Sequence, residues 1–63
     1  MKYYNFHTMI KSIKDLLSDY LKNNNIYYEL SGTNKDWYFV ILADAAGAAA
    51  INKYIDTIII EEA

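Results

Sequence analysis

The junction between residues 37–42 and 43–50 constrains the fold more than any other part of the chain. Residues 37–42 read WYFVIL, a run of bulky side chains typical of a strand. They are followed by ADAAGAAA, in which Asp44 is the only polar side chain. Because aspartate is a favourable helix N-cap and alanine the best helix former, we predict a short helix over residues 45–54.

The alanine-rich helix is expected to approach the sheet closely. Bulky side chains on both layers would overfill a thin core, whereas alanine and glycine let the two backbones come near each other. Volume matching explains only one face of the helix. Ala46, Ala49 and Ala50 extend around its circumference, where a solvent-facing helix normally carries charged residues. Two interpretations remain open: the helix contacts the core alone, or it contacts the core and also a second neighbouring helix or protein.

An anion site at the start of this helix is disfavoured. Backbone N–H groups at a helix N-terminus can hold a phosphate. The chain contains neither GxGxxG nor GxxxxGK[ST], however, and Asp44 would place a negative charge where the phosphate would bind.

A second helix is predicted over residues 5–23 from apolar side chains at i, i+3, i+4 spacing. Asn5 or Thr8 is expected to cap its start, and the three asparagines at 23–25 to end it. The apolar stripe of this predicted helix consists of Phe6, Met9, Ile10, Ile13, Leu16, Leu17, Tyr20 and Leu21.

Two strands are predicted between the helices. Residues 26–31 and residues 37–42 are rich in aromatic and β-branched side chains, and residues 32–36 form a turn-rich loop that joins them as an antiparallel hairpin. Residues 56–62 contain three consecutive isoleucines and favour a final strand. Continuation of the preceding helix to the end of the chain is the alternative, because the isoleucines also fit helical spacing.

The predicted fold class is therefore α+β, a small single domain over residues 1–63 with the order α-β-β-α-β. If residues 2–5 add a short N-terminal strand, the order becomes that of a minimal ferredoxin-like fold. Such an order is an analogy at the level of the fold and implies no function.

Both faces of the predicted hairpin are apolar. A sheet that is covered on one side normally alternates between apolar and polar residues, and this one does not. Either the two helices cover opposite faces, or one face is an interface with a protein. The predicted interface residues are Tyr27, Tyr38, Val40 and Leu42 on the hairpin, with Ala46, Ala49 and Ala50 on the helix.

Composition limits the ways in which so small a core can be stabilised. The chain has 63 residues, no cysteine and one histidine, His7, so we expect no disulfide, no metal site and no cofactor. Its apolar fraction of 54% includes ten aromatic residues, which is difficult to bury in a monomer of this size. These features favour self-association, as a homodimer or larger oligomer, or a partner protein.

Charge and hydropathy disfavour other classes of partner. Six lysines oppose eight acidic residues, arginine is absent, and the net charge is −2, which disfavours nucleic acid. An aromatic sheet can stack single-stranded bases, but this sheet lacks the basic surround that such binding requires. The longest strongly apolar run, residues 37–43, is far below the ~20 residues that span a bilayer. We found no secretory signal and expect a cytoplasmic protein.

No catalytic signature is present. Serine and threonine hydroxyls are present, but His7 is the only imidazole and its neighbours resemble no catalytic signature. Asp15 and Asp19 lie on a predicted solvated helix face. We therefore expect no enzymatic activity. The leading hypothesis is a non-catalytic inhibitor or adaptor that occludes a partner protein's surface, a type found in phages and mobile elements. The alternatives are a homo-oligomeric regulatory module that binds a small ligand or nucleic acid at a subunit interface, and a structural subunit of an assembly.

Overall fold

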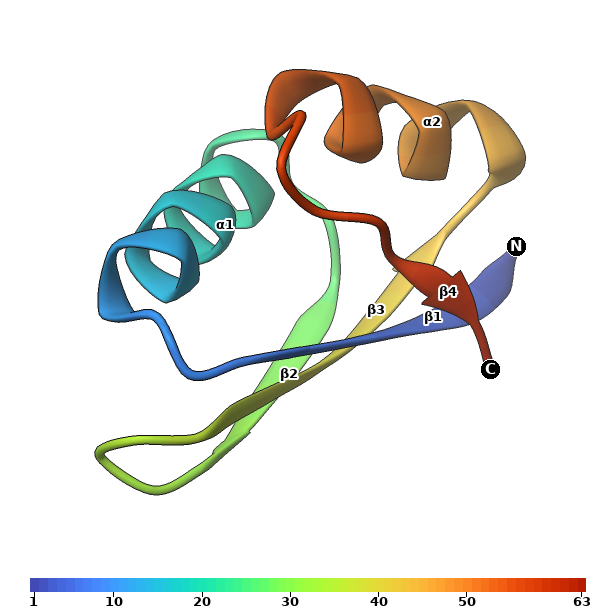
Figure 1. The fold of residues 1–63 in the computed structure, drawn as a ribbon. Helices are drawn as coiled ribbons and strands as arrows, with labels where there is room; N and C mark the ends of the chain where they lie inside the picture. Colours follow the sequence, from blue (N-terminus) through green and yellow to red (C-terminus); the bar gives the residue numbers. More distant parts are fainter.

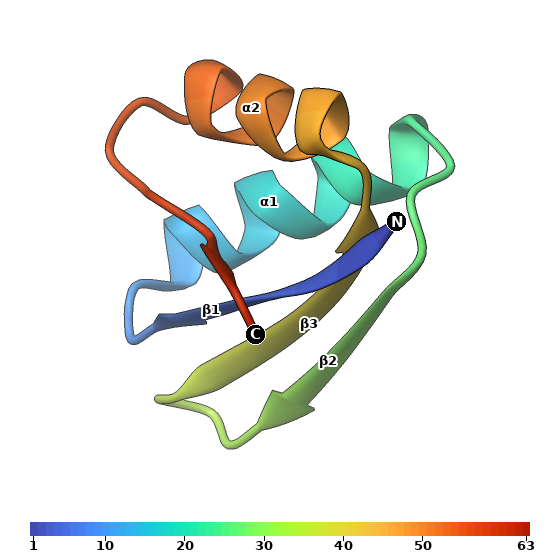
Figure 2. The same cartoon turned by 90° about the vertical axis from the view of Figure 1, so that its right-hand side faces the viewer.

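The computed structural model describes residues 1–63 as a two-layer α+β domain. Its four strands form one antiparallel sheet in the spatial order β2-β3-β1-β4. Both helices pack on the same face of this sheet (Figure 1; Figure 2). In chain order the elements are β1 (Lys2–Thr8), α1 (Lys11–Asn23), β2 (Tyr28–Gly32), β3 (Trp37–Ala43), α2 (Ala45–Tyr54) and β4 (Glu61–Glu62).

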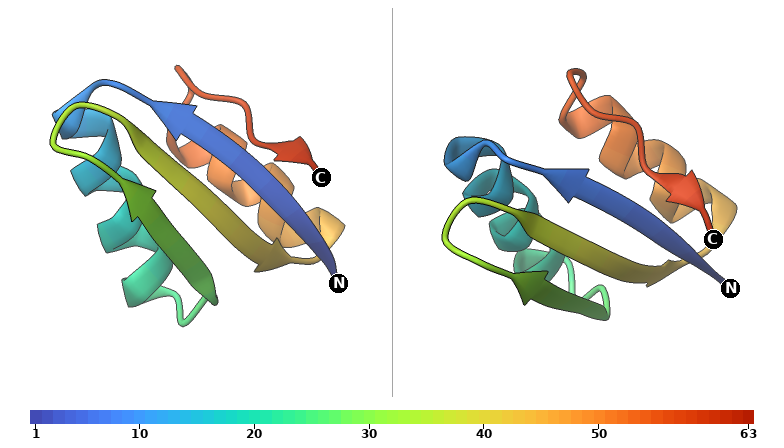
Figure 3. Two further views of the ribbon diagram at one scale, coloured as in Figure 1. Left: turned by 90° about the horizontal axis from the view of Figure 1, so that it is seen from below. Right: turned by 60° about the horizontal axis from the view of Figure 1, so that its bottom comes forward.

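This order confirms the α+β class and the ferredoxin-like alternative that includes an N-terminal strand. The placement of both helices on one face contradicts the interpretation in which they cover opposite faces. Viewed from the sheet side, both helices lie behind the strands (Figure 3). One face of the sheet is therefore left without a helix.

The helix predicted over residues 5–23 starts too early, because residues 5–8 belong to β1. The strand runs from Lys2 to Thr8 and pairs along its whole length with β3, so the helix begins only at Lys11. Phe6 belongs to the strand and packs against Phe39, with 6.3 Å between ring centroids. The apolar residues around Phe6 fit both the spacing of a helix and the alternation of a strand. The long-range pairing with β3 stabilises the strand.

The start of α1 also differs from the prediction. Met9 and Ile10 are exposed in the connection between β1 and α1, and Ile10 occupies the N-cap position without a side-chain cap. Asn5 lies within β1 and caps nothing. The hydroxyl of Thr8 accepts a hydrogen bond from the Ile10 amide at 3.1 Å, which stabilises the turn into the helix rather than the helix itself.

The predicted end of α1 is confirmed. The helix ends at Asn23, and the Asn24 side-chain amide donates to the Tyr20 carbonyl at 2.8 Å. Asn25 adopts a positive φ of 55°, a conformation that asparagine tolerates better than most residues. The chain then turns back toward the sheet and enters β2.

The predicted antiparallel hairpin is confirmed, with its strands shifted slightly. β2 and β3 pair from Tyr28 with Ile41 to Gly32 with Trp37. Gly32 has a φ of +123°, and a Cβ at this position would collide with the carbonyl of Asp36 across the loop. The close approach of these two backbone segments therefore requires glycine.

α2 matches its predicted bounds and cap. The Asp44 carboxylate accepts a hydrogen bond from the Gly47 amide at 2.7 Å, as an N-cap does. Of the alanines in the helix only Ala48 is buried, while Ala46, Ala49 and Ala50 are exposed. Close packing on the sheet therefore uses one alanine, together with the half-buried Gly47 and the fully buried Ile51.

The C-terminal segment is extended, so the alternative of one long helix is wrong. α2 ends at Tyr54, and the paired strand is shorter than predicted, covering only Glu61 and Glu62. Ile58 and Ile60 are buried while Ile59 is 73% exposed, which is the alternation of a strand. The Ile60 amide donates to the Asn52 side chain at 2.9 Å, which anchors this segment to α2.

The core lies between the sheet and the two helices. Its five fully buried large side chains come from α1, β3 and α2: Leu17, Leu21, Phe39, Ile41 and Ile51. Partly buried aromatic and aliphatic residues pack around this cluster, among them Phe6, Tyr28 and Trp37. No helix of the structure has the length and apolar character needed to cross a membrane.

Candidate functional site: the open face of the sheet

The face of the sheet opposite the helices is the candidate site, and we call it the open face. Alternate residues of a strand point to opposite sides of the sheet, so the buried Tyr4, Phe39 and Ile41 fix which side faces the core. The positions that alternate with these residues are exposed or half-buried. The open face consists of Tyr3, Asn5 and His7 of β1, Tyr38, Val40 and Leu42 of β3, and Tyr27, Glu29 and Ser31 of the adjoining edge.

Four of the predicted interface residues are brought together on this face. Tyr38, Val40 and Leu42 alternate along β3, and the Leu42 amide donates to the Tyr27 carbonyl at 3.0 Å, which extends the hairpin ladder to Tyr27. Tyr27 and Tyr38 are 52% and 49% exposed. The open face is thus rich in tyrosine and aliphatic side chains.

The three predicted alanines lie elsewhere. Ala46, Ala49 and Ala50 are exposed on α2, and this helix packs on the other face of the sheet. A single flat partner cannot contact these alanines and Tyr38 at once. The predicted set therefore divides into two separate surfaces.

Sequence reasoning missed the contribution of β1. Tyr3 is 52% exposed on the open face, and His7 stacks on Tyr38 with 4.4 Å between ring centroids and 18° between planes. The alternation of apolar and polar residues from Tyr4 to His7 was the available signal, but the helical spacing that begins at Phe6 obscured it.

His7 is fixed by a second contact. Its Nε2 atom lies 3.0 Å from the Oδ1 atom of Asp36, in the loop that connects β2 and β3. Both side chains are partly exposed. The pair joins the end of β1 to the hairpin loop, and together with the stacking on Tyr38 it holds the imidazole in one orientation.

A hydrogen bond between neighbouring side chains also orders the edge of the face. The Tyr27 hydroxyl donates to the Glu29 carboxylate. This hydrogen bond, with smaller contributions from desolvation and from the negative charge of Glu29, raises the pKa of Tyr27 above its ordinary value. Tyr27 and Glu29 therefore present a fixed polar group beside the apolar centre of the face.

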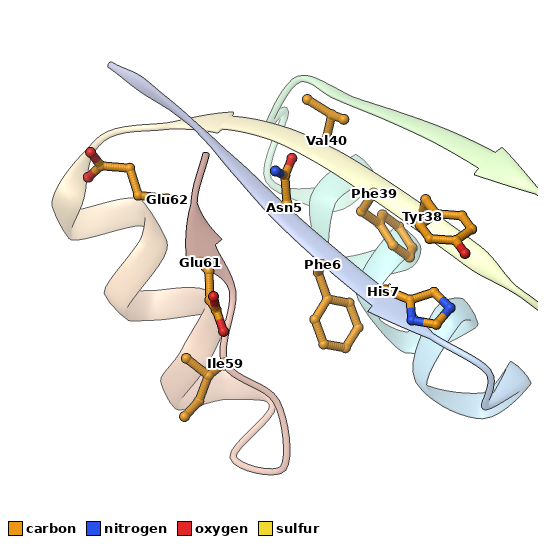
Figure 4. Close-up of a pocket in the computed structure, with 9 residues that line it drawn as sticks. All are labelled: Asn5, Phe6, His7, Tyr38, Phe39, Val40, Ile59, Glu61 and Glu62. Carbon is orange, nitrogen blue, oxygen red and sulfur yellow. The ribbon is translucent and has the colours of Figure 1, made fainter.

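A shallow concavity of about 590 Å³ opens beside the start of β4, where the outer edge of β1 continues without a neighbouring strand (Figure 4). The rings of Phe6, His7 and Tyr38 lie on one side of it, and Ile59 and Glu61 lie on the other (Figure 4). The concavity exists because β4 pairs only with Tyr4 and Asn5. Beyond Asn5 the outer edge of β1 has no strand beside it.

The structure contains no group of three or more histidine, cysteine or acidic side chains placed to hold a metal ion. The side chains of the open face are tyrosine and imidazole rings, aliphatic groups and a few polar groups, among them the Glu29 carboxylate. No protein-family model, curated protein or solved structure matches this chain.

Proposed function

We propose that this chain is a small non-catalytic interaction protein, an inhibitor or adaptor that covers a surface of a partner protein with its open face. The observation that carries the proposal is the exposure of Tyr3, Tyr27 and Tyr38 on a sheet face that no helix covers. Tyrosine is enriched at protein interfaces, because it buries a large rigid ring and keeps a hydroxyl for hydrogen bonding.

The contrast between the open face and the outer side of α1 supports this assignment. The exposed side of α1 carries Lys11, Asp15 and Lys22, which is the usual pattern of a solvated helix. The open face instead places Val40 and Leu42 between exposed tyrosines. An antiparallel sheet that faces only water normally presents polar side chains there.

The surroundings of His7 favour binding over catalysis. His7 and Asp36 resemble the base and the orienting acid, respectively, of a nucleophilic site. His7 makes no hydrogen bond to a serine, threonine or tyrosine hydroxyl, so the pair lacks an activated nucleophile. A role in fixing the Tyr38 ring accounts for both of its contacts.

The test is a double charge insertion in the centre of the open face. Tyr38→Lys with Val40→Lys is expected to keep the monomer folded and to abolish capture of a stoichiometric, nuclease-resistant partner from lysate of the native host. The matched control is Ala46→Lys with Ala49→Lys, which adds the same charge to exposed positions of α2 and should leave capture unchanged. Loss of capture by the control variant alone would indicate that the interface lies on α2. Unchanged capture by both double variants would contradict the proposal.

Self-association is the second candidate, and the free edge of β2 favours it. Natural edge strands are usually protected by lysine, proline or a bulge. Residues Tyr28 to Gly32 contain neither lysine nor proline, and their outer edge pairs with no other strand. Light scattering on the pure protein separates the two candidates: a mass of several chains, with no foreign partner captured, would favour a homo-oligomer.

A further inference from the structure

The net negative charge of the protein lies on the residues of its sheet and hairpin loop. The helices, the Asp44 cap and the connection before β4 carry four lysines and four acidic residues, so this layer is neutral. The strands and the hairpin loop carry two lysines, Lys2 and Lys35, against Glu29, Asp36, Glu61 and Glu62. The whole net charge of −2 therefore resides on the layer that forms the open face.

Only one of these four acids has no side-chain partner. Glu29 accepts from Tyr27, Asp36 pairs with His7, and Glu62 lies 3.3 Å from the Lys2 ammonium. Glu61 takes part in no salt bridge and no side-chain hydrogen bond within 3.5 Å, and it lines the concavity beside β1. A carboxylate in this position is available to a cation from outside the molecule.

The other walls of the concavity suit the rest of a long cationic side chain. Ile59 is 73% exposed at its rim and offers an aliphatic surface. His7 and Tyr38 form a stacked pair of rings that also lines it. A guanidinium group stacks on aromatic rings and forms two parallel hydrogen bonds with a carboxylate, whereas an ammonium group acts as a point charge.

We propose that this concavity receives an arginine side chain of the partner protein, with its guanidinium on Glu61 and its stem against Ile59. The inference rests on the proposed function and specifies the partner's chemistry. The chain contains no arginine, so a second copy cannot supply the side chain and would bring the same negative charge to the face. Nucleic acids and anionic lipid surfaces are repelled by that charge.

The test uses a short peptide, acetyl-Val-Arg-Val-amide, titrated into isotopically labelled protein and followed by the amide NMR signals. The expected result is saturable shifts at Asn5, His7, Tyr38 and Glu61, with weaker binding by the matched lysine peptide. The citrulline peptide has nearly the same shape without the charge and should bind about tenfold more weakly or not at all. Equal shifts with the arginine and citrulline peptides would overturn the inference.

Variants locate the contact on the protein. Glu61→Gln is expected to weaken binding of the arginine peptide about tenfold. Glu29→Gln removes the same charge from the same face outside the concavity and should change binding by less than about threefold. Equal losses in the two variants would show attraction to the whole face rather than an arginine site, and absence of shifts up to about 10 mM peptide would contradict the site outright.

The failure of this inference is distinguishable from failure of the proposed function. If Tyr38→Lys with Val40→Lys abolishes partner capture while Glu61→Gln leaves the affinity for the purified partner unchanged, the open face is the interface and the arginine site is wrong. If the peptide binds at Glu61 but the double lysine variant still captures its partner, the concavity binds arginine and the proposed interface is wrong.

Discussion

Tyr27 shows how a single residue of the open face is held in place by its neighbour. Its hydroxyl donates to the Glu29 carboxylate two positions along the chain. Tyrosine can donate this hydrogen bond only while it is protonated, so the bond favours the neutral form. The ring is thereby fixed at the rim of the face in an orientation set by the sequence Tyr-Tyr-Glu.

This contact predicts a measurable titration. Because the pKa of Tyr27 is raised, the stability that its hydrogen bond contributes is present below the unfolded-state pKa of about 10 and is lost as the pH rises through the folded-state pKa. NMR titration of the Tyr27 ring signals should show this hydroxyl ionising at a higher pH than a tyrosine in an unfolded peptide. Glu29→Gln should lower its pKa, and an unchanged Tyr27 titration in that variant would contradict the assignment.

Among the elements, α2 is the one whose boundaries were predicted correctly. Aspartate followed by a run of alanines is a local signal, and the Asp44 cap needs no distant partner. Asp44→Ala should lower the free energy of unfolding by about 1 kcal/mol, measured by urea denaturation. Asp56→Ala is the control, since Asp56 forms no salt bridge or side-chain hydrogen bond, and an equal loss there would show that the effect is not capping.

The elements that were predicted incorrectly depend on contacts far apart in the chain. Residues 5–8 satisfy helical spacing, and only pairing with β3, whose residues lie 29 to 35 positions further along the chain, makes them a strand. Similarly, residues 56–62 have strand composition along their length, but only Glu61 and Glu62 pair with β1. Local pattern predicts what a segment favours, and tertiary pairing decides where the strand begins and ends.

The candidate site was predicted in part for the same reason. The alternation along β3 is local, so the grouping of Tyr38, Val40 and Leu42 on one face followed from sequence. Placing both helices on the other face depends on topology, which separated these residues from Ala46 and Ala49. The contact between His7 and Asp36 joins residues 29 positions apart, and no local pattern indicates it.

For the whole molecule, a small core implies that each fully buried side chain matters. A domain of this length is expected to have a stability of only about 3–9 kcal/mol. Leu17→Ala removes a fully buried side chain and should cost about 2–5 kcal/mol in urea denaturation. Leu16→Ala, at a neighbouring position that is 41% exposed, should cost less than about half as much, and equal losses would contradict the placement of α1 on the sheet.

Strand parity in the sheet separates two sets of positions that natural or artificial selection can vary independently. Side chains that point toward α1 and α2 form the buried core, while Tyr3, Tyr27, Tyr38 and Val40 of the open face lie outside it. Randomising Tyr3, Tyr27, Tyr38 and Val40 together would therefore produce new binding surfaces on the same fold. A protein with this architecture can acquire a different binding partner by a few substitutions on the open face, without a change of fold.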